Sequence, residues 1–372
     1  MTLTKGDDYP IHQTPEPIAF SGTDRNFYDR YFFNGYAPYG DEARSQLMFA
    51  AAFGVYPHLN IADASFVFVR DGVETALHAS KWLNMERMDL SVGPITIEIV
   101  EPLKVLKLIV DAPEQGLKAE ITFTGRAVPI EEPRFMRRIG PRSFMDYTRM
   151  TQNGRYAGWI ELDGKRQDIS GFVGTRDRSW GVRPIGARDP QETIPVQAPQ
   201  FFWLWSPCNF EAGSFFFHTN DDAAGLPWNR RAVWQPDGAE PHDFDHGVSS
   251  EVVWAAGTRH AATAAVNIEN AHGKMSVSFE PGLKFFMLGL GYTHPKWGHG
   301  MAHGPLVVER EDFVLADIDV MQPQFLHIQA LSNVTYTAPD GGQVKGRGVL
   351  EQLVLGPHAP SGFKEMLDRA PW

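Results

Sequence analysis

Short apolar runs separated by tight turns recur along most of this chain, and they constrain its fold more than any other feature. The sequence holds 35 glycines and 27 prolines, together with 25 Phe, 10 Trp and 10 Tyr. Turn-forming residues at this density interrupt helices, whereas aromatic and β-branched residues favour strands. The pattern therefore predicts an all-β chain with few short helices.

The candidate strands fall into two series on either side of a stretch without periodicity. The first series covers 47–56, 65–70, 73–79, 95–100, 104–110 and 118–126. It ends in a hairpin whose Asp163-Gly164 turn joins 156–162 to 166–173, because such a dipeptide favours a tight β-turn. The second series covers 201–206, 214–219, 231–235, 249–255, 262–269, 274–280, 313–321, 325–336 and 343–355.

Residues 183–199 separate the two series and are rich in proline and polar side chains. With 372 residues, the chain is longer than a single β core usually is. We therefore expect two β domains, residues 1–190 and 191–372. The second domain is expected to end in a short helix over Ser361–Leu367, with Ser361 as its N-cap.

Charge and composition exclude several classes of partner. The formal net charge is −11, the isoelectric point is about 5.6, and no basic block occurs, so the electrostatic pattern of a protein that binds nucleic acid is missing. Cys208 is the single cysteine, which rules out an internal disulfide. No apolar run is long enough to cross a bilayer and no signal-peptide core is present. We expect a cytoplasmic protein without an integral membrane segment, and a homodimer stays open.

Cofactor motifs are also missing from the sequence. It contains no G-x-x-x-x-G-K-[ST] loop, no G-x-G-x-x-G between a strand and a helix, and no G-x-S-x-G elbow. These motifs mark phosphate sites, dinucleotide sites and hydrolase nucleophiles. We therefore expect no nucleotide cofactor and no hydrolase triad.

The run Gly174–Gly181 reads Gly-Thr-Arg-Asp-Arg-Ser-Trp-Gly, so one acid stands between two arginines. Successive side chains of a strand point to opposite faces. Asp177 therefore projects from one face, and its neighbours Arg176 and Arg178 project from the other. The carboxyl group points away from the two guanidiniums beside it in sequence.

This separation leaves two interpretations of Asp177. In a barrel interior without an adjacent cation, burial disfavours the charged carboxylate, and the protonated acid can serve as a general acid. Alternatively, Asp177 is ionised and pairs with an arginine of another strand, as structural acid–arginine pairs do. The sequence alone supports either interpretation.

A second unusual run, residues 289–304, combines glycines with Tyr292 and three histidines. His294, His299 and His303 have the spacing H-x-x-x-x-H-x-x-x-H, and imidazole is the commonest metal ligand. The glycines and a proline predict an irregular loop, so no periodicity brings the rings together, and we predict no metal here. Tyr292 and His294 are instead candidate catalytic residues that face a ligand, one of them as a proton carrier.

Aromatic side chains form stripes in the second series. Phe201, Trp203 and Trp205 alternate onto one face of a strand, and His218 ends a neighbouring apolar strand. Such a stripe is either core or the wall of a cavity that shelters a cationic centre. The candidate substrate-binding residues are Tyr147, Trp203, Trp205, His218 and Trp297.

The acidic motif and the hairpin before it resemble the double-lipocalin group that includes carotenoid 1,2-hydratase, AttH-like proteins and kievitone hydratases. The hydratase motif has an aromatic residue, then His-Asp-His-Asn, one further residue and Gly. Asp177 and Gly181 keep their places, whereas the aromatic is replaced by Thr175 and both histidines are replaced by arginines. The runs 291–300 and 348–351 are most similar to poorly characterised bacterial members of this group.

The resemblance implies two lipocalin-like antiparallel β-barrels or half-barrels. It also implies a cofactor-independent hydratase, dehydratase, isomerase or cyclase acting on a hydrophobic terpenoid, steroid-like or polyketide-like molecule, with Asp177 as proton donor. If the pocket only holds an extended ligand in a folded shape, proximity alone would accelerate a pericyclic cyclisation. The competing hypothesis is a non-catalytic carrier of a hydrophobic ligand, a common role of lipocalin-type barrels.

Overall fold

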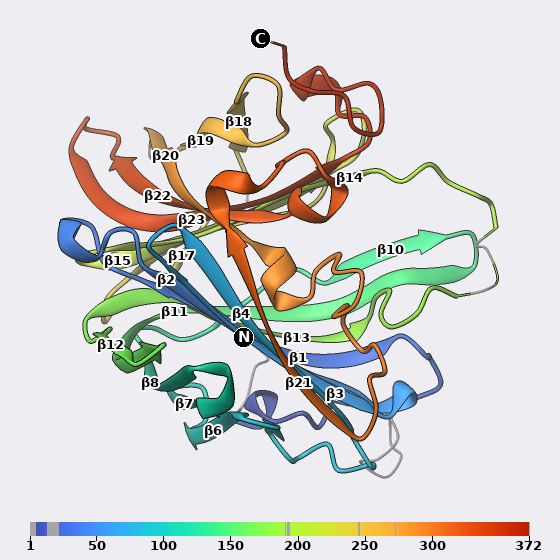
Figure 1. Ribbon diagram of the computed structural model, residues 1–372. Helices are drawn as coiled ribbons and strands as arrows, with labels where there is room; N and C mark the ends of the chain where they lie inside the picture. The colour runs from blue at the N-terminus through green and yellow to red at the C-terminus, as the bar shows by residue number, and fades with distance from the viewer. Residues whose placement is uncertain are drawn as a thin grey trace. The chain divides into compact units, whose positions relative to one another are not determined.

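The structure is a computed structural model that describes residues 5–12, 22–189, 191, 194–244, 246–271 and 273–371. The chain forms two compact units. Unit 1 comprises Met1–Ala37, Leu47–Gln197 and Leu288–Val314, and unit 2 comprises Pro38–Gln46, Ala198–Met287 and Leu315–Trp372. Each unit is built on one antiparallel sheet, and most of the strands are labelled in Figure 1.

The sheet of unit 1 is a nearly closed barrel. Its strands are β1 (Phe27–Tyr36), β2 (Met48–Tyr56), β3 (Ile61–Arg70), β4 (Val73–Trp82), β5 (Ser91–Val92), β6 (Ile95–Glu101), β7 (Val105–Ala112), β8 (Leu117–Gly125), β9 (Ile130–Glu131), β10 (Phe135–Ile139), β11 (Arg142–Leu162), β12 (Lys165–Asp168), β13 (Phe172–Val182) and β21 (Leu306–Val314). The main order is β21-β4-β3-β2-β1-β13-β11-β8-β7-β6-β5. Strands β5 and β6 approach β3 and β4, which nearly closes the barrel.

Strand β1 is buried on both faces of the sheet. Alternate residues such as Tyr31 and Phe33 belong to the apolar core, which also contains Phe53 and Phe123. The residues at the alternate positions of the strand, such as Arg30, point to the other face and are buried as well. Because both faces are shielded from water, the polar groups of the second face need internal partners, and these partners build the site described below.

Unit 2 is a half-barrel with the order β17-β16-β15-β14-β23-β22-β20-β19-β18. The strands are β14 (Phe201–Phe210), β15 (Gly213–Asp221), β16 (Pro227–Pro236), β17 (His242–Asp243), β18 (Val248–Trp254), β19 (Ala261–Asn270), β20 (Gly273–Phe286), β22 (Ile328–Thr337) and β23 (Gln343–Leu355). Phe202, Leu204, Phe215, Phe217 and Leu350 lie in its apolar core. The predicted all-β fold with two lipocalin-like domains is confirmed.

Helices are limited to single 3-10 turns in the described part of the chain. They are η1 (Lys5–Asp8), η2 (Glu42–Arg44), η3 (Pro57–Leu59), η4 (Pro113–Gln115), η5 (Met287–Leu290), η6 (Leu315–Asp317), η7 (Pro323–Phe325) and η8 (Ala359–Ser361). None of the helices among these residues has the length and apolar character of a membrane span.

The predicted C-terminal helix over Ser361–Leu367 is wrong. Ser361 ends the short turn η8, and Gly362 follows it in the left-handed conformation with φ 75°. A residue in that conformation ends a helix, and the backbone of Phe363 then pairs with His358 in an isolated bridge. The segment continues without an α-helix to the last described residues.

The predicted hairpin is present, but its second arm is interrupted. Asp163 and Gly164 both have positive φ, 51° and 74°, as a type I′ hairpin turn requires. The arm that follows is broken: β12 ends at Asp168, Gly171 has φ 86°, and β13 begins at Phe172. Beyond the break, β13 continues along the same partner strand β11 and pairs with β1 on its other side.

Candidate active site

The alternation predicted for the Arg-Asp-Arg motif is present in β13. Arg176 and Arg178 are buried with the barrel core, where their guanidiniums lie over the rings of Phe123 and Tyr31. Arg176 forms an ion pair with Asp8, and Arg178 Nη1 lies 2.7 Å from Asp29 Oδ1. The two arginines therefore hold acids inside the barrel.

Asp177 lies on the other face of β13, where it is half-buried. Its cross-strand partner on β11 is Thr151, so Arg149, two residues along β11, is a diagonal neighbour on the same face. Burial alone lowers the pKa of the Arg149 guanidinium, but nearby acids, Glu132 first and Asp177 among them, raise it well above its usual value.

A cavity of about 570 Å³ opens in unit 1, and Asp177 is not among the described residues that line it. Its walls come from the segment after β13, the segment before β1, the β10–β11 hairpin and the loop after η5. The side chains that shape it include the apolar residues Ile139, Phe144, Ile185 and Val196 and the polar residues Arg25, Arg142, Arg183, Arg188, Asp189, Tyr292, His294 and His299. The cavity thus combines an apolar wall with a group of cations.

Tyr292 is placed in the cavity wall by a tightly turned loop. The preceding Gly291 has φ 89°, and a Cβ there would lie 2.5 Å from the carbonyl oxygen of Trp297, so only glycine fits. The Tyr292 ring lies 4.9 Å from the guanidinium carbon of Arg30 and 5.6 Å from that of Arg183. Two cations therefore flank one phenol.

The His299 ring lies between these two cations. Arg30 Nη1 lies 2.8 Å from His299 Nδ1 and 2.5 Å from its Nε2, and Arg183 Nη2 lies 3.1 Å from Nδ1. His299 Nε2 also lies 3.0 Å from the carbonyl oxygen of Leu290. The Tyr292 ring contacts His299 edge-on, with 4.4 Å between ring centroids. A second proton on this ring would add a third positive charge beside two guanidiniums, which repel it.

His294 also lines the cavity, but both of its ring nitrogens are engaged on the protein side. Nδ1 accepts the backbone N–H groups of Lys296 at 3.0 Å and Trp297 at 2.8 Å. Nε2 therefore carries the proton and donates to Glu311 Oε2 at 2.8 Å. These bonds make His294 a residue that fixes the loop, with no free nitrogen to transfer a proton in the cavity.

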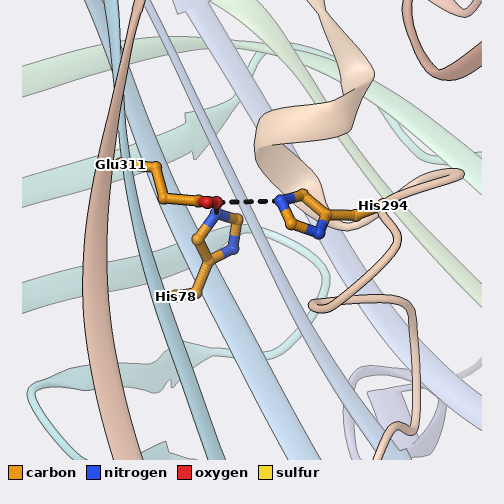
Figure 2. Close-up of side chains that lie close together, drawn as sticks. All are labelled: His78, His294 and Glu311. Atoms are coloured by element: carbon orange, nitrogen blue, oxygen red, sulfur yellow. Dashed lines mark hydrogen bonds and ion pairs between the residues drawn. The ribbon is translucent and has the colours of Figure 1, made fainter.

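Figure 2 shows the Glu311 carboxylate between the rings of His78 and His294. His78 Nε2 lies 3.2 Å from Glu311 Oε2 and His78 Nδ1 lies 3.1 Å from Ser65 Oγ. The hydrogen bonds from His78 and His294 lower the pKa of Glu311 to about 2, although burial opposes them. Burial also lowers the pKa of His78. The three groups therefore form a network of one carboxylate and two neutral imidazoles.

Two histidines and a carboxylate are also a common metal-ligand set, and the three ligand atoms lie within 4.8 Å of one another. Binding through Nε2 would require His294 to carry its proton on Nδ1. That atom already accepts two backbone N–H groups, so the proton would face two donors. The geometry fits a hydrogen-bonded network better than a metal centre.

Two further predicted site residues of unit 1 lie beside the cavity. Tyr147 is buried and stacks on Phe135 with 4.7 Å between centroids, and its edge contacts Tyr28. Trp297 stacks on His78 at 5.3 Å and also contacts His303 at 4.2 Å. Both rings support residues around the cavity, and neither is among the described residues that line it.

The other predicted residues, Trp203, Trp205 and His218, belong to unit 2. They alternate with the core residues of β14 and β15, so they project from the opposite face of that sheet. The carboxylate of Glu351 organises part of this face: it accepts from Trp203 Nε1 at 2.9 Å, His327 Nε2 at 2.9 Å and Gln329 Nε2 at 2.7 Å. His218 Nε2 bonds Asn229 Oδ1 at 2.8 Å.

The sequence interpretation missed Arg30, Arg183, His78 and Glu311. Arg30 and His78 lie in apolar strands, where a polar residue interrupts the pattern. Glu311 lies on β21, and Arg183 follows β13 directly. The polar interruptions were a usable signal, but their partners come from distant parts of the chain.

The comparison with known proteins identifies the family and the fold. A model described as a family of unknown function, DUF8625, matches residues 3–364. No curated protein matches the sequence. A solved structure assigned as AttH, from Nitrosomonas europaea, is similar with a TM-score of 0.51 and 12% identity over 92% of this chain and 98% of that chain. Kievitone hydratase from Nectria haematococca is similar with a TM-score of 0.44 and 11% identity, over 93% and 97% of the two chains.

The likeness to the AttH structure extends over nearly all of both chains and concerns the fold alone. The family match covers almost the whole sequence, including the acidic motif, the loop that carries Tyr292, and strand β21. This chain belongs to the family of unknown function DUF8625.

Proposed function

We propose that this chain is a cofactor-independent enzyme of the lyase or isomerase type that acts on a small molecule in the unit 1 cavity. The observation that carries the proposal is the position of Tyr292 in the cavity wall, with its ring 4.9 Å from the Arg30 guanidinium and 5.6 Å from that of Arg183. A phenol can donate and accept a proton, and fixed cations stabilise negative charge that develops on an oxygen.

Tyr292 is the proposed proton-transfer residue. Both nitrogens of His294 are bonded to the protein, and both nitrogens of His299 lie against Arg30, Arg183 or the Leu290 carbonyl. Hydration, dehydration, isomerisation and cyclisation each need only proton transfer and control of developing charge. The groups around the cavity can supply both.

Asp177 has a supporting role in this proposal. Its charge acts on Arg149, and the two groups lie on neighbouring strands of the same sheet face. Asp177 is not among the described residues that line the cavity, so it is not placed to give a proton to a molecule bound there. We therefore assign Asp177 to the alignment of Arg149 and assign proton transfer to Tyr292.

The proposed substrate has a largely apolar body, such as a terpenoid, steroid-like or polyketide-like molecule. The apolar side chains of Ile139, Phe144 and Ile185 in the cavity wall support this choice. The fold-level likeness to the AttH structure is compatible with it, but a fold alone does not decide function.

The test incubates wild type, Tyr292→Phe and Asp177→Asn with a panel of unsaturated terpenoid, steroid and polyketide compounds. Mass spectrometry then detects products that differ by one water or are isomers of the substrate. Tyr292→Phe should lower turnover by about 100-fold or more while native mass spectra still show the bound ligand. Tyr39→Phe, which removes an exposed hydroxyl in unit 2, is the matched control and should keep full turnover.

Two results would overturn the proposal. One is wild-type turnover by Tyr292→Phe. The other is a ligand retained unchanged and equally by all variants, which is the behaviour of a carrier. Loss of turnover in Asp177→Asn with retained turnover in Tyr292→Phe would move the proton-donor role back to Asp177.

A further inference from the structure

Two other arginines of the cavity form ion pairs that Arg183 lacks. Arg25 and Arg142 both pair with Asp189, the former with 3.1 Å between Nη1 and Oδ1. Arg183 has no carboxylate within ion-pair distance in the part of the chain that the structure describes; it bonds the His299 ring instead. Its Nε is buried without a hydrogen-bond partner.

Aromatic rings lie next to the Arg183 guanidinium, at a place where an anionic partner would be expected. Its guanidinium carbon lies 4.5 Å from the ring of Tyr28 and 5.6 Å from that of Tyr292. Arg30 brings a second positive charge to the same imidazole. The acid that acts on both arginines is Asp63, but its oxygens bond the Tyr56 hydroxyl at 3.0 Å and the Gly300 amide at 2.7 Å.

Arg183 is half-buried, and a guanidinium that is partly removed from water normally has an anionic partner, because desolvation of an unpaired charge costs free energy. Here the guanidinium lines a cavity large enough for a small molecule. The planar fork of an arginine binds a carboxylate through two parallel hydrogen bonds. The missing anion is therefore best supplied by the ligand.

We infer that the molecule bound in this cavity is an amphipathic carboxylic acid whose carboxylate docks on Arg183. Its apolar body lies against Ile139, Phe144 and Ile185. The carboxylate end places the molecule beside Tyr292. That this acid is the substrate rests on the proposed function. That it binds in the cavity through Arg183 is tested independently.

The experiment titrates two probes of the same shape, 1-naphthoate and the neutral 1-naphthamide, into the full-length protein by isothermal calorimetry. We expect wild type to bind the carboxylate at least about tenfold more tightly than the amide, as for a hydrogen bond to a charged group. Arg183→Gln should abolish that preference and leave the affinity for the amide unchanged. Arg183→Lys keeps the charge without the fork and should give an intermediate preference.

The matched control is Arg166→Gln, which removes the same charge from an exposed position on β12 that stacks on Trp159. It should bind both probes as wild type does, and circular dichroism checks that each variant is folded. Equal affinity for the two probes, an unchanged preference in Arg183→Gln, or no binding of the carboxylate would overturn the inference. Carboxylate binding through Arg183 without turnover of any compound would overturn the proposed function alone.

Discussion

Arg178 and Asp29 form an ion pair inside the barrel of unit 1, with 2.7 Å between Nη1 and Oδ1 and both side chains fully buried. Burial by itself raises the pKa of the Asp29 carboxyl, but Arg178 first, then His12 and Arg87, outweigh it and the net pKa is lowered. Arg178 also donates to the backbone carbonyls of Asp7 and Tyr9. One arginine of the motif thus holds the N-terminal segment on the barrel.

Arg178→Gln should lower the free energy of unfolding by about 3–5 kcal/mol, because it leaves the buried Asp29 without its main cation. Denaturant unfolding measures the loss. The double variant with Asp29→Asn should lose less than the sum of the two single variants. Lys104→Gln, which breaks an exposed pair with Glu101, is the control with an expected loss below about 1 kcal/mol. A similar small loss in Arg178→Gln would contradict the assignment.

Glu311→Gln should destabilise unit 1 by about 1–3 kcal/mol, because a neutral amide oxygen then replaces the charged Oε2 that faces both His78 Nε2 and His294 Nε2, and hydrogen bonds to charged groups are the stronger ones. Thermal and denaturant melts give the loss. Glu309→Gln lies on the same strand and breaks an ion pair with the exposed Lys296, so its expected cost is at most about 0.5 kcal/mol. Equal losses in the two variants would show that the bonds to His78 and His294 contribute nothing.

The His78–His294–Glu311 network should not respond to metal. His294 Nδ1 accepts two backbone N–H groups, so its Nε2 holds a proton that a metal would have to displace. Addition of zinc, and separately of EDTA, should leave the melting temperature unchanged, since only a ligand of the native state raises it. A zinc-dependent rise that disappears in His78→Ala would instead establish a metal site.

The stability of unit 2 should decrease in mild acid because of His260. Burial, with a smaller effect of Lys284, lowers the pKa of this histidine from 6.5 to about 3. The unfolded chain therefore binds the proton at a higher pH than the folded chain. The free energy of unfolding falls as the pH decreases from about 6.5 towards 3, by about 2 kcal/mol between pH 7 and pH 5. In His260→Gln, urea unfolding at these two pH values should show that much less change, and an unaltered pH dependence would disprove the assignment.

Trp203→Phe should cost unit 2 about 1–3 kcal/mol beyond the loss of ring contacts, because the buried Glu351 carboxylate loses a donor. Trp234→Phe is the comparison: it also replaces an indole by a phenyl ring, but the Trp234 ring stacks on Tyr336. Denaturant unfolding of the two variants gives the difference. If both lose the same stability, the bond from Trp203 to Glu351 is without net effect.

Local pattern in the sequence determined the fold class and the faces of individual strands. The Asp163-Gly164 turn has the positive φ values of a hairpin, and strand alternation by itself puts Asp177 on the face opposite to Arg176 and Arg178. These features follow from two or three neighbouring residues. The C-terminal helix failed for a local reason as well, since Gly362 adopts a left-handed conformation that the Ser361–Leu367 pattern did not reveal.

The sequence also singled out Tyr292 and His294, but the tertiary structure decided what surrounds them. Glu311 reaches His78 only because β21 pairs with β4, and Arg30 and Arg183 meet at His299 although all three are far apart in the chain. No periodicity encodes such contacts. The register between distant strands and the path of a glycine-rich loop bring these charged groups together. Burial then determines how strongly each of them favours its charged or neutral form.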